Sequence, residues 1–278
     1  MNATAECKKL GWRHPVWDLL RFFLSIKGAN RIATWLEQLR NFSTIDVEGA
    51  GAFPVNADDV KLFFAYLDQR EKDFAEAFAL LRVEEEAVSF CKTNSIAVKQ
   101  VKTKNQDHHQ SSAAMVATVS AIANRVCDEI GIKTNTAPQA RCVWLHEKGL
   151  HVTARNMDGT LPMLANPAII WEIKEYWGQT SGGSKMSDAV YECNLVGREL
   201  REFEERSGIS VAHVVFVDGK IQWTARKSDL KRFLDLMNQG LIDYVFVGKE
   251  VETSWEPTLR QLIKDKVFKG IPKTKNEK

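Results

Sequence analysis

The strongest constraint on the fold is a set of short apolar runs in the second half of the chain that alternate with helical patterns. The runs have the length and the β-branched and aromatic content of buried strands, and they cover 167–177, 210–219 and 242–248. The segments beside them repeat apolar residues at three- and four-residue spacing, over 113–131, 187–208 and 228–240. This order predicts an α/β fold, with a mixed central β-sheet flanked by helices.

Two further patterns predict a hairpin and the ends of a helix. Residues 140–159 contain two extended runs around Lys148-Gly149, which predicts a hairpin before the first apolar strand. A later helix is expected to run from an N-cap at Ser228 to a C-cap at Gly240. The helix at 187–208 should bury one apolar face, made of Ala189, Cys193, Val196, Leu200 and Phe203.

The first part of the chain has a different pattern. Residues 15–100 are mainly helical in their apolar spacing, with a turn-rich break at 47–59. Asn56 or Asp58 is expected to cap the helix that follows the break, since both residue types are favoured at N-caps. We therefore expect an N-terminal helical region.

A polar stretch at 102–112 separates the two patterns and indicates a linker or an exposed loop. We expect a helical N-terminal domain over 1–105, which would serve recognition, dimer contacts or both. A second domain is expected over 112–278, ending in a basic tail.

Charge and cysteine usage narrow the class of protein. The formal net charge is only +2, but cations gather at 97–105 and again from Arg260 to the end of the chain. Such clusters attract nucleic acid or are simply solvated surface, and both interpretations stay open. The five cysteines contain no CxxC pair, which favours a reduced cytoplasmic setting and argues against a structural zinc. The apolar stretch at 17–26 contains Asp18 and Arg21 and is too short to span a bilayer, so no membrane partner is expected.

Charged residues continue one of the apolar runs. Glu172 and Lys174 lie two residues apart, so on a strand their side chains share one face. Asp158 precedes this strand, and an antiparallel neighbour would bring its carboxylate beside Glu172. Two adjacent carboxylates repel unless a cation neutralises them, and Mg²⁺ does so with oxygen ligands. A lysine beside such a site can orient or deprotonate an attacking water.

Asp158 followed by Glu172-Ile173-Lys174 resembles the D…(D/E)xK signature of the PD-(D/E)xK nuclease superfamily, which includes many restriction endonucleases. The order of elements is also similar: a helix, a hairpin with the acid late in it, ExK in the next strand, then a helix and a strand. The likeness covers about 112–250, and Met157 stands where the signature has proline.

The resemblance implies a restriction-endonuclease-like core and Mg²⁺-dependent hydrolysis of double-stranded DNA, most typically by a type II restriction enzyme. It implies that Asp158, Glu172 and the carbonyl of Ile173 bind the metal and that Lys174 serves the water. A double-strand cut needs two protomers, so a homodimer or a heterodimer with a related subunit is expected. The strand and the helix after it look most like enzymes that cut an asymmetric site with two different subunits.

The ExK triplet alone is weak evidence, since a second copy occurs at Glu6-Cys7-Lys8 with no strand or acid before it. The alternative for Glu172 and Lys174 is a salt-bridged pair at an exposed strand end. Weaker candidates are Glu129 as an additional acid, and Ser184 and Lys185 as contacts to the DNA backbone. Two other functions stay open: a structure-specific repair or phage-defence nuclease, and a non-catalytic DNA-binding subunit.

Overall fold

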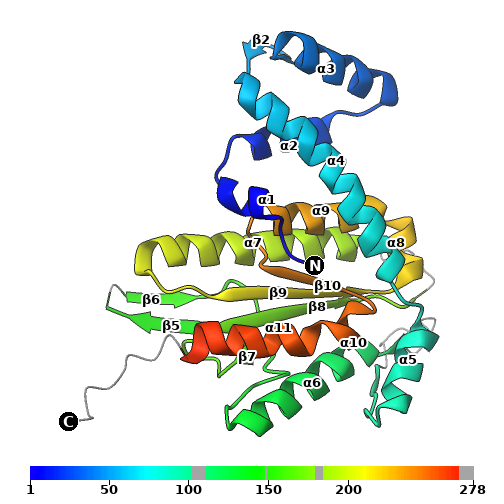
Figure 1. The fold of residues 1–278 in the computed structure, drawn as a ribbon, viewed down its shortest axis with the longest axis vertical. Coiled ribbons are helices and arrows are strands. Elements are labelled where there is room, and N and C mark those ends of the chain that lie inside the picture. Colours follow the sequence, from blue (N-terminus) through cyan, green and yellow to red (C-terminus); the bar gives the residue numbers. More distant parts are fainter. Residues whose placement is uncertain (102–110, 148, 179–183, 269–278) are drawn as a thin grey trace.

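The computed structural model describes residues 1–101, 111–147, 149–178 and 184–268. Its centre is a four-stranded mixed sheet with helices on both faces, which confirms the predicted α/β class (Figure 1). The strands follow the order β10-β9-β8-β7, and their bounds are Tyr244–Val247, Ala212–Asp218, Ile169–Glu175 and Gly159–Leu161. β8, β9 and β10 run parallel, while β7 pairs antiparallel with β8 at the edge.

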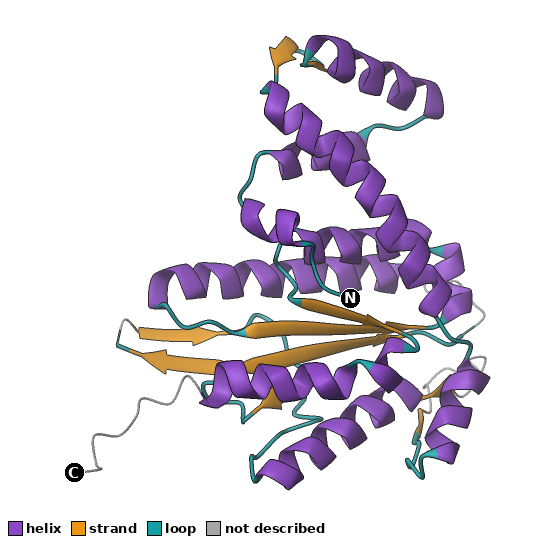
Figure 2. Cartoon of the chain, viewed as in Figure 1, coloured by secondary structure: helices purple, strands orange, loops and turns teal. Residues whose placement is uncertain are grey.

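Helices cover the sheet in two layers, as Figure 2 shows. One face packs against α7 (Ser184–Ser207), α8 (Lys220–Ala225) and α9 (Lys227–Asn238). The other face packs against α6 (Ala114–Ile130), α10 (Glu250–Thr253) and α11 (Trp255–Leu262), which continues into a short π-helix, η1 (Ile263–Phe268). The three layers therefore enclose two apolar cores, one on each side of the sheet.

Strand β8 divides its side chains between these layers with the period of two that a strand imposes. Ile169 and Trp171 pack into the core beneath α6 and α11. Ile170 packs on the other face, against residues of α7, so Glu172 and Lys174 point to this face as well. The predicted common face of Glu172 and Lys174 is confirmed, but both residues are buried, so they are not an exposed pair at a strand end.

Helix α7 buries the predicted face, because Ala189, Cys193, Val196, Leu200 and Phe203 are all inaccessible to solvent or nearly so. The predicted caps of α9 are shifted by one or two residues. The helix begins at Lys227 with Arg226 as N-cap, which leaves Ser228 in the first turn, and Gln239 is the C-cap. Gly240 follows with a φ of 77°, a conformation that glycine adopts without strain.

The hairpin predicted around Lys148-Gly149 is present, but it forms a small sheet of its own. Its strands are β5 (Val143–His146) and β6 (Gly149–Val152). Asp158 therefore lies beyond the hairpin and not late within it. It directly precedes β7, the edge strand of the central sheet.

The N-terminal region is helical, as predicted. Its helices are α1 (Ala5–Leu10), α2 (Val16–Ser25), α3 (Ala29–Phe42), α4 (Ala57–Leu80) and α5 (Glu84–Thr93). Asn56 caps α4, since its side chain accepts hydrogen bonds from the amides of Asp58 and Asp59. The turn-rich break forms an unpredicted hairpin of β1 (Thr44–Val47) and β2 (Gly51–Pro54).

Helix α4 connects this region to the sheet. Its first half shares a core with α2 and α3, whereas Ala77 near its end packs with α7 and α9. Arg70 forms a buried ion pair with Asp235 of α9 at 2.6 Å. Just beyond the helix, Arg82 and Asp218 pair at 2.7 Å, and both side chains are fully buried. The first pair fixes α4 against α9, and the second fixes the segment after α4 against the end of β9.

The predicted boundary at 102–112 stays a prediction, since residues 102–110 lie outside the described part of the chain. Strands β3 (Gln100–Val101) and β4 (Ser111–Ser112) pair on either side of it. Ala87 and Cys91 of α5 share a buried cluster with Ala114 of α6, which argues for a boundary closer to the N-terminus. Among the described residues, no helix combines the length and apolar character needed to cross a membrane.

Candidate active site

Asp158, Glu172 and Lys174 meet in one polar pocket of about 380 Å³ at the β7–β8 edge of the sheet. The strand pairing explains this, because β7 places Gly159 opposite Trp171 and so sets Asp158 beside the charged end of β8. The remaining walls come from the segments that flank the hairpin and from α7, and they are Gln139, Arg141, Ala154, Arg155, Asn156 and Glu192.

The carboxylate of Asp158 is oriented by the main chain. Its Oδ2 accepts a hydrogen bond of 2.8 Å from the backbone amide of Ile173, and its Oδ1 accepts one of 3.2 Å from Gln139. The amide of Asp158 itself donates to the carbonyl of Trp171 at 3.1 Å. The two halves of the predicted motif are thus joined by backbone hydrogen bonds.

The neighbouring residue must be glycine for this pairing to exist. A Cβ added to Gly159 would lie 1.7 Å from Cε2 of the Trp171 ring, far inside contact distance. The indole of Trp171 packs across Gly159 and is completely buried. Gly159 therefore allows β7 to approach β8 closely at the point where Asp158 enters the pocket.

Glu172 and Lys174 form the centre of an ionic network. Nζ of Lys174 lies 2.8 Å from Oε2 of Glu172 and 3.2 Å from Oε2 of Glu192. Glu192 also pairs with Arg155, whose side chain is about half exposed. Charge therefore alternates along a chain from the buried strand to the surface.

The second oxygen of Glu172 faces away from Lys174. Its Oε1 lies 3.2 Å from Nε2 of His213 on the neighbouring strand β9. Nδ1 of His213 lies 3.1 Å from the carbonyl oxygen of Leu241. Cys193 of α7 completes a fully buried group with Glu172 and His213.

The pKa values of the pocket follow from burial and from these pairings. Burial opposes the charge on Glu172, but the attraction of Lys174 and the contact with His213 outweigh it and lower the pKa of Glu172 to about 2. Burial also opposes the charge on Lys174, yet Glu172 raises the lysine pKa well above its usual value. Burial raises the pKa of Asp158, although the hydrogen bond from Ile173 acts in the opposite direction. Glu172 and Lys174 are therefore a charged pair at neutral pH.

The donor set of the pocket fits a hard divalent cation. Asp158 and Glu172 offer carboxylate oxygens, and Glu192 adds a third carboxylate on the opposite wall. The amide and carbonyl of one strand residue point to the same side, so the carbonyl of Ile173 faces the side of Asp158. Magnesium commonly binds through one or two carboxylates and keeps waters and substrate phosphate oxygens as its other ligands. Asp158, Glu172 and Ile173 would hold it here.

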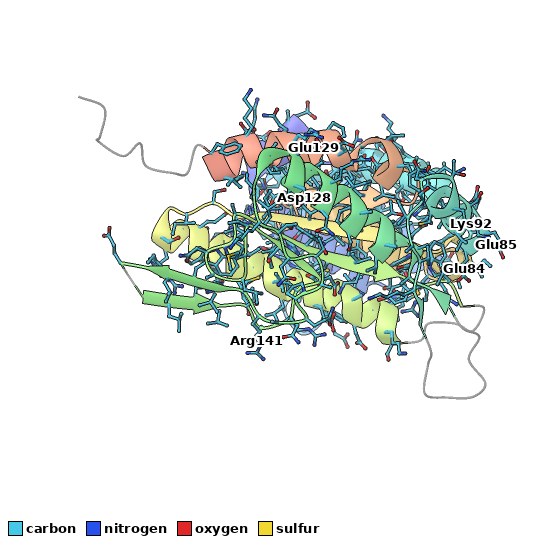
Figure 3. The ribbon with its side chains drawn as sticks, turned by 90° about the horizontal axis from the view of Figure 1, so that it is seen from below. Glu84, Glu85, Lys92, Asp128, Glu129 and Arg141 are labelled. Atoms are coloured by element: carbon cyan, nitrogen blue, oxygen red, sulfur yellow. The ribbon has the colours of Figure 1, made fainter. Side chains whose placement is uncertain are left out.

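The weaker sequence candidates do not reach the pocket. Glu129 lies at the C-terminal end of α6 and pairs with Arg260, and Figure 3 shows it across the molecule from Arg141, which lines the pocket. Ser184 and Lys185 begin α7, and both are exposed. Residues 179–183 before them and the end of the basic tail at 269–278 lie outside the described residues.

Sequence reasoning missed four residues of this site. Glu192 and Arg155 come from separate segments, and only the tertiary fold places them beside Lys174. His213 carried a usable signal, because it interrupts an apolar strand in the same way that Glu172 does. Cys193 was predicted only as part of an apolar helix face, which it is, although it also contacts the charged end of β8.

Residues 68–262 match the family described as Domain of unknown function (DUF7687). The match covers more than half of the chain and includes every residue that lines the pocket, so the protein belongs to this family. No curated protein matches the chain, nor does any solved structure.

Proposed function

We propose that this protein is a Mg²⁺-dependent endonuclease that hydrolyses phosphodiester bonds of double-stranded DNA. The observation that carries the proposal is the convergence of Asp158, Glu172 and Lys174 in one polar pocket where β7 pairs with β8. The mixed sheet, with a helix before the hairpin and α7 after the ExK strand, is the arrangement that a restriction-endonuclease-like core would have.

The pocket residues would divide the chemistry among them. Magnesium, when bound, would neutralise the two carboxylates and polarise the scissile phosphate. Because Glu172 keeps Lys174 protonated, the lysine would orient the attacking water and offset charge at the phosphate, and would not act as a base. Arg141 and Arg155 line the mouth of the pocket, where exposed guanidinium groups would contact flanking phosphates. In-line attack would leave a 5′-phosphate and a 3′-hydroxyl.

The setting that we propose is a cytoplasmic type II restriction enzyme or a subunit of one. Each chain contributes one such pocket and would cut one strand, so a homodimer or a heterodimer with a related subunit would make the double-strand cut. The helical N-terminal region would supply recognition or dimer contacts.

The test is a digest of a fully sequenced plasmid in Mg²⁺ and in EDTA, with the cut ends mapped. We expect cleavage in Mg²⁺ only, and discrete fragments with common end sequences. The variant Asp158→Asn should lose cleavage, because an amide cannot replace the metal-binding carboxylate. Glu129→Gln is the matched control, since Glu129 lies outside the pocket, and it should cut at the rate of the unmodified protein.

The result of the digest also distinguishes the proposed restriction enzyme from the two alternative functions. A smear without common ends would indicate a nuclease that recognises DNA structure, as in repair or phage defence. Binding of DNA without any cleavage would favour a non-catalytic subunit, in which the ion network of Glu172 and Lys174 is purely structural. Equal loss in Asp158→Asn and Glu129→Gln would remove the support for this pocket.

A further inference from the structure

We infer that Glu172, Cys193 and His213 form a second metal site, selective for a thiophilic divalent ion such as Zn²⁺ or Co²⁺. One ligand atom from each residue lies within 4.8 Å of the other two, and all three residues are buried. A sulfur, an imidazole nitrogen and a carboxylate oxygen form a donor set that zinc accepts and magnesium does not. The inference does not depend on nuclease activity.

The orientation of His213 supports this assignment. Its Nδ1 lies 3.1 Å from the carbonyl oxygen of Leu241, which can only accept, so the ring proton belongs on Nδ1. In the metal-bound form Nε2 would present its lone pair to the ion. Histidine ligands of metals are commonly fixed in this way, by a hydrogen bond from the other ring nitrogen to a carbonyl.

The contact between His213 and Glu172 needs a positive charge between the two side chains, which either a second ring proton or a metal ion supplies. Nε2 of His213 lies 3.2 Å from Oε1 of Glu172, and an ionised carboxylate is only an acceptor. A metal ion between the two atoms would supply this charge. In a tetrahedral zinc site, neighbouring nitrogen and oxygen ligands lie about 3.3 Å apart, which is close to the observed separation.

Charge balance also favours a divalent ion at this position. One carboxylate and one thiolate carry two negative charges, so a divalent ion with a neutral histidine makes a buried cluster of zero net charge. The thiol of Cys193 would release its proton when the metal binds, as coordinating thiols do. Lys174 can keep its contact with Glu192 at 3.2 Å, so it does not depend on Glu172 alone.

The two carboxylate oxygens of Glu172 face different sites, one the proposed magnesium site and the other this buried cluster. Oε2 faces Lys174 and the polar pocket, whereas Oε1 faces His213 and the interior. Glu172 lines the pocket, whereas Cys193 and His213 lie behind it in the interior. Glu172 would then be a ligand shared between a hard and a soft cation.

The test is a titration of the complete protein with Co²⁺, without Mg²⁺ or DNA, followed by absorption. We expect a near-ultraviolet band of thiolate-to-cobalt charge transfer and intense visible bands of tetrahedral cobalt, saturating at one equivalent. One equivalent of Zn²⁺ should displace the Co²⁺ and so remove both the near-ultraviolet and the visible bands. Absence of the near-ultraviolet band in the unmodified protein would overturn the site, whatever the variants do.

Two variants identify the ligands. Cys193→Ser should lose the near-ultraviolet band, and His213→Gln should weaken Co²⁺ binding by about 100-fold or more, beyond the 10–100-fold typical of residues that only orient a ligand. Cys91→Ser is the matched control, since Cys91 is equally buried but contacts Thr118 and the carbonyl of Ala114. Cys91→Ser should keep the near-ultraviolet band, and a band that persists in Cys193→Ser would also overturn the assignment. Because no step measures cleavage, failure here leaves the proposed nuclease untouched.

Discussion

The backbone amide of Ile173 donates a hydrogen bond of 2.8 Å to Oδ2 of Asp158. This contact joins two segments that are separated by a loop and an edge strand, and it sets the plane of the Asp158 carboxylate. A carboxylate that is oriented by the main chain needs no reorganisation when a ligand binds. The precision of the candidate site therefore depends on the pairing of β7 with β8.

The first prediction tests this dependence through Gly159. In Gly159→Ala the new methyl group would overlap the Trp171 ring, so β7 must move away from β8. We expect a loss of about 1–3 kcal/mol in the free energy of unfolding, which is typical of overpacking. We also expect slower cleavage, because Asp158 moves with its strand. Urea unfolding and cleavage rates measure the two effects, and an unchanged stability would contradict the close approach.

The second prediction concerns Lys174. Lys174→Ala should slow cleavage by about 100-fold or more, since the proposed mechanism places the positive charge of Lys174 at the transition state. DNA binding in Ca²⁺, measured by gel shift, should stay near that of the unmodified protein. Cleavage at a near-normal rate would remove Lys174 from the proposed mechanism.

Lys174→Ala should also change the stability of the protein, because the residue that it leaves unpaired is buried. Lys174 is the partner of a carboxylate that is 3% exposed, so Lys174→Ala leaves Glu172 without its closest cation and should cost about 3–5 kcal/mol of stability. A bound divalent cation would replace the missing charge. Mg²⁺ should therefore raise the melting temperature of Lys174→Ala more than that of the unmodified protein. Lys185→Ala, an exposed change at the start of α7, is the control.

The third prediction tests Glu192, which sequence reasoning did not find. Glu192 contacts both Lys174 and Arg155, so Glu192→Gln should loosen the position of Lys174 and slow cleavage by about 10–100-fold. Glu205→Gln is the matched control, because Glu205 lies on the same helix but pairs at the surface with Arg13. Equal rates for the two variants would show that Glu192 has no part in the reaction.

The sequence was sufficient for those features that depend on local pattern. Strand β8 followed from its apolar run, and the buried face of α7 followed from its helical spacing. The common face of Glu172 and Lys174 followed from the period of a strand. Even Asp158 was placed beside β8 by assuming an antiparallel neighbour, which β7 supplies.

Features that depend on contacts between distant segments could not be predicted in the same way. No local pattern indicates that Glu192 lies beside Lys174, or that His213 and Cys193 lie beside Glu172. The length of α4 was also not evident, since its two halves pack in different cores and its apolar pattern changes between them. The glycines at 49 and 51 carried a hairpin signal, and both adopt a positive φ, Gly49 in the turn and Gly51 at the start of β2.

The last prediction concerns pH and Glu175, at the end of β8. Its carboxylate accepts hydrogen bonds of 2.9 Å and 3.2 Å from the amides of Met115 and Val116 in the first turn of α6, and a further one from Trp177. Burial raises the pKa of Glu175 from 4.5 to about 7, although the bonds from these donors act in the opposite direction. The folded protein therefore binds this proton more tightly than the unfolded chain does.

The sign of the effect follows from this difference. The stabilisation is fully present below pH 4.5, where the carboxyl group is protonated in both states, and it is lost as the pH rises through about 7. The shift corresponds to about 3 kcal/mol.

Glu175→Gln is neutral at every pH and should lack this dependence. Relative to the unmodified protein, the variant should gain about 3 kcal/mol in the free energy of urea unfolding between about pH 4.5 and pH 8.5. Other titrating groups are common to both proteins and cancel in the comparison. If the free energies of unfolding of the variant and the unmodified protein differ by the same amount at both pH values, the hydrogen bonds at the start of α6 offset the cost of burying the Glu175 carboxylate.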